Sequence, residues 1–156
     1  IADANCKPDP KRARYVLSLP KALEVRAMAE AASHLTGLRD FGAFCKPREG
    51  ATTIRELRKL DVEREEDGRI VITFGADAFC HNMVRSIVGA LIAVGEGRVS
   101  IQQLVAIQQE AVRTSKFKVV DPRGLSLDGV DYPAEHLLAA QAEKARNMRS
   151  SEEISV

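Results

Sequence analysis

The sequence has no tryptophan, two tyrosines and five phenylalanines in 156 residues. Proteins that bind single-stranded nucleic acid by stacking interleave aromatic side chains with basic ones, and this composition does not supply that pattern. If the chain contacts a nucleic acid, contacts with the backbone and shape of a folded RNA are therefore the better prediction.

Cysteine is also scarce. The three cysteines, Cys6, Cys45 and Cys80, are odd in number and include no Cys-x-x-Cys pair, and the three histidines are scattered along the chain. A structural zinc site needs four such ligands at short, regular spacings, which are missing here. The sequence therefore predicts a reduced, cytoplasmic protein without a metal site.

Long hydrophobic runs are absent as well. Charged residues interrupt the apolar stretches well before the roughly 18 residues that a membrane-spanning helix needs. The first residues show no basic-then-apolar signal organisation. Neither membrane insertion nor secretion is predicted. The formal net charge is only +1, which argues against general binding of polyanions and makes any RNA contact depend on local basic patches.

Basic residues gather in three such patches. Acidic neighbours, among them Glu49, Glu56 and Asp61, offset the second patch, so each patch is either an RNA contact or an ordinary solvated face. The patches are Lys11, Arg12 and Arg14; then Lys46, Arg48, Arg55, Arg58 and Lys59; and finally Lys116, Lys118 and Arg123.

The length and the 45% hydrophobic content suit a single core. Apolar periodicity predicts a strand at 14–19, a helix at 23–35, a loop at 40–50, and strands at 52–65 and 70–74 joined by a hairpin at Asp67-Gly68. An apolar helix follows, then a helix at 100–109 capped by Ser100, and a closing strand at 125–132. A last helix begins at Pro133, and residues 150–156 are predicted to be a disordered tail. We expect an α+β fold, with a mostly antiparallel sheet and helices packed on one face.

The last helix is amphipathic. It carries Leu137, Leu138, Ala142 and Ala145 on one side, at the spacing of a face that packs on the sheet or on a sister subunit.

The most informative segment is residues 79–91. Its apolar residues recur at the three-and-four spacing of a core-facing helix, and Arg85 lies beside this stripe with no carboxylate within one turn. One interpretation is that the alkyl stem of Arg85 covers apolar surface while its guanidinium stays in water. The other is that its counter-charge comes from another strand, another domain or a bound phosphate.

Residues 79–91, continued by residues 94–97, resemble the helix motif of bacterial tRNA pseudouridine synthase A. Residues 37–44 resemble the Gly-x-His-Asp-Phe-x-x-Phe segment of that family, with Arg39 where a histidine is usual and Gly42 where a hydroxyl residue is frequent. Residues 124–132 resemble its closing strand. The resemblance covers roughly residues 10–133 and implies the C-terminal, pseudouridine-synthase-like half of such an enzyme.

Members of this family carry their catalytic aspartate in a Gly-Arg-Thr-Asp-Ala-Gly type segment, and no such segment occurs here. The chain also opens on Ile1. We therefore interpret residues 1–149 as the C-terminal domain of a longer synthase whose N-terminal catalytic half is absent, so that this chain alone is expected to be inactive.

The resemblance implies an isomerase that converts specific uridines of the tRNA anticodon stem-loop to pseudouridine in the cytoplasm. It implies no cofactor and no metal, with tRNA as the partner and a homodimer as the assembly. It also implies that Arg85 pairs with the catalytic aspartate of the absent half, because an adjacent guanidinium keeps a buried carboxylate ionised and fixes its orientation.

His81 and Asn82 are expected near the mouth of the same pocket, at a helix N-terminus that suits a phosphate. The alternative is that Asn82 caps the helix and His81 is a bystander. The candidate RNA-binding residues are His81, Asn82, Lys46, Arg48, Arg55 and Arg123.

Two other functions stay open. The chain could be a noncatalytic RNA-binding or dimerisation module, since it has basic loops but no nucleophile. A small-molecule enzyme that uses Cys80 and His81 is disfavoured, because adjacent residues at a helix start diverge by about 100°.

Overall fold

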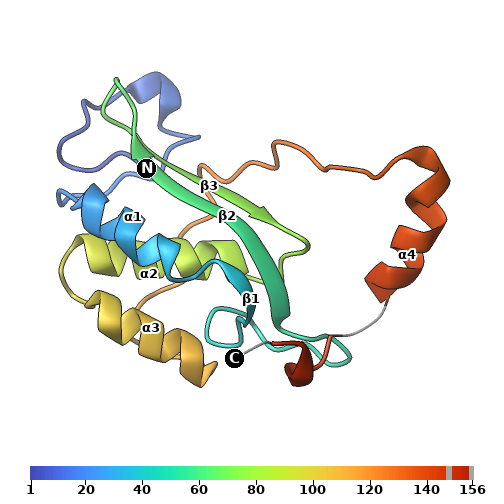
Figure 1. Cartoon of the computed structure of the whole chain (residues 1–156). Helices are drawn as coiled ribbons and strands as arrows, with labels where there is room; N and C mark the ends of the chain where they lie inside the picture. The colour runs from blue at the N-terminus through green and yellow to red at the C-terminus, as the bar shows by residue number, and fades with distance from the viewer. Residues whose placement is uncertain (147–148, 155–156) are drawn as a thin grey trace.

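The computed structural model describes residues 1–146 and 149–154 and shows an α+β fold (Figure 1). Three antiparallel strands, β1 (Gly37–Asp40), β2 (Ile54–Arg64) and β3 (Ile70–Ala76), form a sheet in the order β1-β2-β3. Helices α1 (Val25–Ser33), α2 (Met83–Gly95) and α3 (Ile101–Glu110) lie together on one side of it. The predicted fold class is therefore confirmed.

The remaining elements are short or lie outside the body of the fold. They are the 3-10 turns η1 (Pro10–Arg12), η2 (Glu135–Leu137) and η3 (Ser151–Glu153), and helix α4 (Leu138–Arg146). Among the described residues, no helix has the length and apolar character needed to cross a bilayer.

Strands β2 and β3 form the predicted hairpin, which turns at Asp67 and Gly68. Cross-strand pairs such as Leu60 with Phe74 and Val62 with Ile72 put apolar side chains on the helix-covered face. An irregularity between Leu57 and Lys59 shifts the register. A bulge of this kind moves later side chains to the other face, which explains why the apolar alternation of this stretch is imperfect in the sequence.

Helix α2 forms the centre of the core. Most of its residues are buried, from Met83 through Ile87 and Leu91 to Gly95. Residues 117–120 pass so close to the helix that a Cβ added at Gly89 would overlap the Lys118 carbonyl oxygen. The absence of a side chain at Gly89 therefore allows this segment to lie against the helix.

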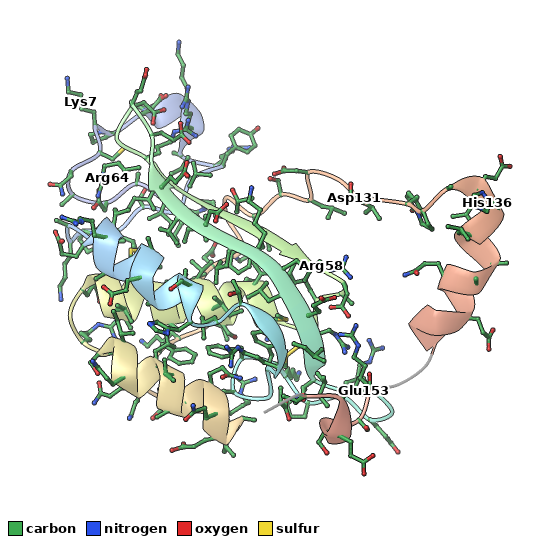
Figure 2. All side chains as sticks on the ribbon, in the orientation of Figure 1. Lys7, Arg58, Arg64, Asp131, His136 and Glu153 are labelled. Atoms are coloured by element: carbon green, nitrogen blue, oxygen red, sulfur yellow. A yellow bond between two sulfur atoms is a disulfide. The ribbon has the colours of Figure 1, made fainter. Side chains whose placement is uncertain are left out.

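The N-terminal residues are held on the hairpin by an ion pair between the buried Asp3 and the half-buried Arg64. Asp3, 3% exposed, accepts from Arg64 through both oxygens, at 2.9 and 2.8 Å, and from the Leu23 N–H at 2.8 Å. These hydrogen bonds from Arg64 lower the pKa of the Asp3 carboxyl from 3.8 to about 2. Figure 2 shows Arg64 where the N-terminal segment meets the strands.

Two predicted strands are wrong. Within residues 14–19 the described structure has a single parallel bridge, Ala2 with Ser18. Residues 125–132 form no ladder and are exposed, with Leu127 and Tyr132 at 79% and 78%. Alternating apolar residues form a strand when a neighbouring strand supplies hydrogen bonds and a surface to cover, and no described segment of this chain does so here.

The predicted helix after Pro133 is present as η2 and α4. Figure 1 shows α4 at the far end of an extended segment, away from the sheet, and Figure 2 places Asp131 and His136 on that arm. Leu137 and Leu138 are accordingly 47% and 41% exposed. The side chain of Ala145 and residues 155 and 156 of the predicted tail lie outside the described residues.

Candidate functional site

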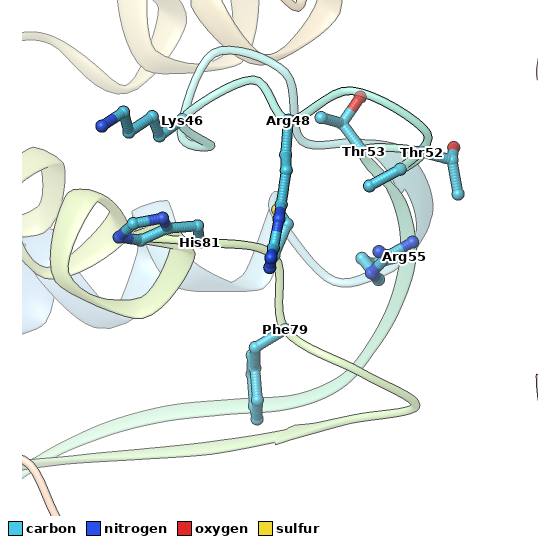
Figure 3. Close-up of a pocket in the computed structure, with 9 residues that line it drawn as sticks. Lys46, Arg48, Thr52, Thr53, Arg55, Phe79 and His81 are labelled. Atoms are coloured by element: carbon cyan, nitrogen blue, oxygen red, sulfur yellow. The ribbon is translucent and has the colours of Figure 1, made fainter.

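A pocket of about 160 Å³ opens where the loop before β2 faces the segment between β3 and α2 (Figure 3). Arg48 reaches from the loop toward the segment that carries Phe79 and His81, and Arg55 lies at the start of β2. The full lining is Lys46, Arg48, Ala51, Thr52, Thr53, Arg55, Phe79, Cys80 and His81. Two segments that are distant in sequence thus form one site.

The two walls of the pocket, which are the loop before β2 and the segment between β3 and α2, are fixed to each other. Cys45 and Cys80 are joined as a disulfide across a sequence separation of 35, with their Cα atoms 5.8 Å apart. One residue further along each wall, the Lys46 N–H donates to the His81 carbonyl oxygen at 2.9 Å. The expectation of reduced cysteines is therefore wrong for this pair, because the fold brings together two residues that no local pattern connects.

The loop is also tied to the sheet. The Asp40 carboxylate accepts from the Gly42 N–H at 2.9 Å and from the Thr53 hydroxyl at 2.6 Å. Phe41 and Phe44, which flank the turn, are fully buried. Asp40 and these rings therefore set the path of the loop, and the basic side chains that follow project from a defined position.

The pocket is positively charged. Lys46 and Arg48 are exposed, whereas Arg55 is half-buried and donates from Nη1 to the Ile54 carbonyl oxygen at 2.6 Å. The buried Nε of Arg55 has no hydrogen-bond partner among residues 1–146 and 149–154. No aspartate or glutamate of these residues lines the pocket. Such an arrangement favours an anion that accepts hydrogen bonds.

The carboxylates on and beside β2 pair with residues that do not line the pocket. Glu56 pairs with Arg58 at 2.9 Å, and Asp77 accepts from the Glu56 N–H and pairs with Arg149, each at 2.8 Å. Lys59 pairs with Asp61 at 3.2 Å. The second basic patch of the sequence thus divides into residues of β2 that pair with carboxylates and residues that line the pocket, where no carboxylate side chain is part of the described lining.

Four of the six candidate RNA-binding residues meet in this pocket, namely Lys46, Arg48, Arg55 and His81. Asn82 stands at the N-cap of α2 with a left-handed φ of 69° and makes no side-chain capping bond. Arg123 lies elsewhere, in the turn after Pro122, with its guanidinium 3.8 Å from the Asp121 carboxylate. The structure therefore joins most of the candidate set and separates Arg123 from it.

Arg85 is half-buried on α2 and does not line the pocket. Its Nε donates to the Val120 carbonyl oxygen at 2.6 Å, and the Val120 N–H donates to the Arg85 carbonyl oxygen at 3.4 Å. Within the described part of the chain it has no ion pair. The segment that lies against Gly89 thus holds one edge of the guanidinium and leaves its two terminal nitrogens for another acceptor.

Four lining residues, Ala51, Thr52, Thr53 and Phe79, were not among the candidates from the sequence. Thr52 and Thr53 precede an apolar strand, where threonine is common, and the exposure of Phe79 depends on how the chain turns after β3. Among the described residues there is no group of three or more histidine, cysteine or acidic side chains that could hold a metal ion.

A family profile described as tRNA pseudouridine synthase matches residues 31–133, which include every residue lining the pocket. The chain belongs to the tRNA pseudouridine synthase family. This confirms the resemblance recognised in residues 37–44, 79–91 and 124–132.

Comparison with individual proteins gives the same family. The chain is 50% identical over 142 residues to tRNA pseudouridine synthase A of Streptomyces avermitilis, covering 91% of this chain and 50% of that protein. It is 45% identical over 141 residues to the tRNA pseudouridine synthase A of Tropheryma whipplei, covering 90% of this chain and 53% of that protein. For the Mycobacterium leprae protein of the same name the identity is 45% over 143 residues, with coverages of 91% and 49%. The chain spans about half the length of the curated relatives it matches.

Proposed function

We propose that this chain is the C-terminal half of an enzyme that isomerises specific uridines in the anticodon stem-loop of tRNA to pseudouridine. The observation that supports this most is the pocket of Lys46, Arg48, Arg55 and His81 in a chain of this family. RNA backbones carry one negative charge per nucleotide, and a site with hydrogen-bond donors and no carboxylate suits a phosphate. We propose that the pocket holds a phosphate of the tRNA.

The reaction breaks the glycosidic bond of a uridine, turns the detached base and rejoins it through carbon. It needs a base extruded from its stack and an aspartate kept ionised away from water. In this proposal the aspartate belongs to the other half of the enzyme, and no cofactor takes part. The assembly is a homodimer in the cytoplasm, with tRNA bound across both subunits.

Arg85 supplies the cation beside that aspartate. Its Nε is already bound to the Val120 carbonyl oxygen at 2.6 Å, which limits rotation of the guanidinium. A carboxylate could then accept from both terminal nitrogens, a planar geometry that lysine cannot reproduce. In the full-length enzyme, Arg85→Lys is expected to lower kcat with little change in KM. Unchanged turnover would end this assignment.

The phosphate site is tested by the salt dependence of tRNA binding to the full-length protein. Arg48→Ala is expected to weaken binding and to reduce the slope of log K against log salt by about one. Arg58→Ala is the matched control, since Arg58 is also an exposed arginine of this region but is paired with Glu56, and it should leave the slope unchanged. Equal effects of the two variants would show that the pocket is not the RNA contact.

The second candidate, a noncatalytic RNA-binding module, is favoured by one observation: the pocket is lined by basic side chains and hydroxyl groups, which can hold a phosphate without a nucleophile. Two results together would support it. This chain would bind a tRNA anticodon stem-loop, and the full-length protein, with its pocket intact, would form no pseudouridine. Arg123→Ala separately tests whether the third basic patch contributes, and an unchanged salt slope would exclude Arg123 from the contact.

A further inference from the structure

Phe79 lies in the segment that joins β3 to α2, and its side chain is 43% exposed. It is positioned by one aromatic neighbour, Phe74 on β3, at a ring-centroid distance of 6.5 Å and an interplanar angle of 77°. Phe41, Phe44 and Phe117 are, by contrast, buried in the core. Phe79 is thus a ring held in place on one side with much of its surface in water.

A single exposed phenylalanine needs no explanation by itself. The position of this one is informative, because Phe79 lines the same pocket as Lys46, Arg48, Arg55 and His81. Tyr15 and Tyr132 are more exposed, at 73% and 78%, but neither lines this pocket. A ring beside several cations offers both of the contacts that an unpaired nucleotide can use, stacking for its base and charged donors for its phosphate.

We propose that Phe79 stacks on an unpaired base of the bound RNA while the cations of the pocket hold the adjoining phosphate. The ligand of the pocket is then a nucleotide in a loop or bulge, and not the backbone of a duplex, whose bases are stacked on one another and inaccessible to the ring. This rests on the phosphate site proposed above. It replaces the expectation that the scarcity of aromatic residues leaves RNA contacts to backbone and shape alone.

The test compares two RNA probes with the full-length protein at fixed salt: a hairpin with an unpaired loop, carrying 2-aminopurine at one loop position, and a fully paired duplex of equal length. Phe79→Ala is expected to weaken binding of the hairpin roughly 5- to 150-fold, the range for loss of one base–aromatic stack. Duplex binding and the salt slope should stay unchanged, since a duplex offers no unpaired base to the ring and the salt slope reports phosphate contacts only.

Companion variants separate stacking from folding. Phe79→Leu retains an apolar contact with Phe74 but removes the aromatic face, so it should bind the hairpin almost as weakly as Phe79→Ala. Phe79→Trp should restore binding and quench the 2-aminopurine fluorescence. Tyr15→Ala, which removes an exposed ring outside the pocket, should bind like the wild type.

Either of two results for Phe79→Ala would overturn the stacking role: a wild-type affinity for the hairpin, or an equal loss of affinity for hairpin and duplex. A wild-type affinity of Phe79→Leu would show that only apolar packing matters, and would overturn it too. A different result would refute the proposed phosphate site: an Arg48→Ala variant whose binding has the same salt slope as the wild type. The two proposals can therefore fail independently.

Discussion

Replacing Asp3 with asparagine is expected to destabilise the chain strongly, because this carboxylate is buried and forms an ion pair with the partly exposed Arg64. Asp3 accepts from Arg64, from the Leu23 N–H and from the Asn5 N–H. Asparagine preserves the shape of the side chain but removes the charge and replaces one acceptor with a donor. Arg64 would then face an amide instead of a carboxylate.

The magnitude follows from the pKa of Asp3, which is lowered from 3.8 to about 2. Each unit corresponds to about 1.4 kcal/mol, so the ionised carboxylate contributes on the order of 2 kcal/mol to folding. Removing one member of a fully buried pair costs about 3–5 kcal/mol, and this is an upper limit here, because the Arg64 side chain is 28% exposed and keeps contact with water. We expect Asp3→Asn to lower the free energy of unfolding by about 2–4 kcal/mol at pH 7.

The pH dependence has a definite sign. Because the pKa of Asp3 is lower in the folded state, its contribution is complete above about pH 5 and is lost as the pH falls from near 4 to about 2. Urea denaturation of wild type and Asp3→Asn at pH 7, 5, 3 and 2 should show a gap that narrows across the lowest values. A gap that stays constant down to pH 2 would refute the assignment of this stability to the ionised carboxylate.

Asp67→Asn is the matched control. Asp67 also pairs with two arginines, Arg69 at 2.7 Å and Arg12 at 2.9 Å, but it is exposed at the hairpin turn. Exposed ion pairs contribute little because water competes for both partners. A loss as large as that of Asp3→Asn would show that burial is not what makes the Asp3 pair strong.

Three further predictions concern packing, capping and the disulfide. Gly89→Ala brings a Cβ against the Lys118 carbonyl oxygen, so it should lower the free energy of unfolding by about 1–3 kcal/mol. It should also speed hydrogen exchange at the Val120 N–H. Gly129→Ala is the control, because a Cβ there meets nothing within 4 Å, and it should change neither quantity. Ser100→Ala removes the acceptor for the Gln103 N–H in the capping box of α3 and should lower the urea midpoint by the equivalent of about 1 kcal/mol; an unchanged midpoint would contradict the cap. Replacing both Cys45 and Cys80 with serine opens a loop of sequence separation 35 and should cost about 4 kcal/mol in the chain-entropy account. Titration of the denatured, unreduced wild type should find one reactive thiol, and three would show that the disulfide does not form.

Local patterns in the sequence predicted the elements that depend on local information. The amphipathic stretches, the Asp67-Gly68 turn and the Ser100 cap all correspond to observed structure, since periodicity and capping act within a few residues. The strand expected at 125–132 failed because the alternation of apolar residues does not say whether a partner strand is present.

The candidate site, too, could be predicted from the sequence only in part. Basic residues at 46, 48 and 55 can be recognised as candidates from charge alone, and the family motif adds His81. The joining of the two walls depends on contacts between distant segments, such as Cys45 with Cys80, which residue types alone do not specify. The same is true of the pairing of Asp3 with Arg64, which are 61 positions apart.

The disulfide of the pocket closes part of the chain into a covalent ring. Residues 45–80 form a closed covalent ring that contains β2, β3 and the exposed loop around Gly50, with the rest of the chain attached as two tails. A protease that cuts the loop at 46–51, an accessible site of the usual kind, would open the ring without dividing the molecule. The nicked protein would keep both walls of the pocket in one covalent piece and would separate into two fragments only after a thiol reductant is added.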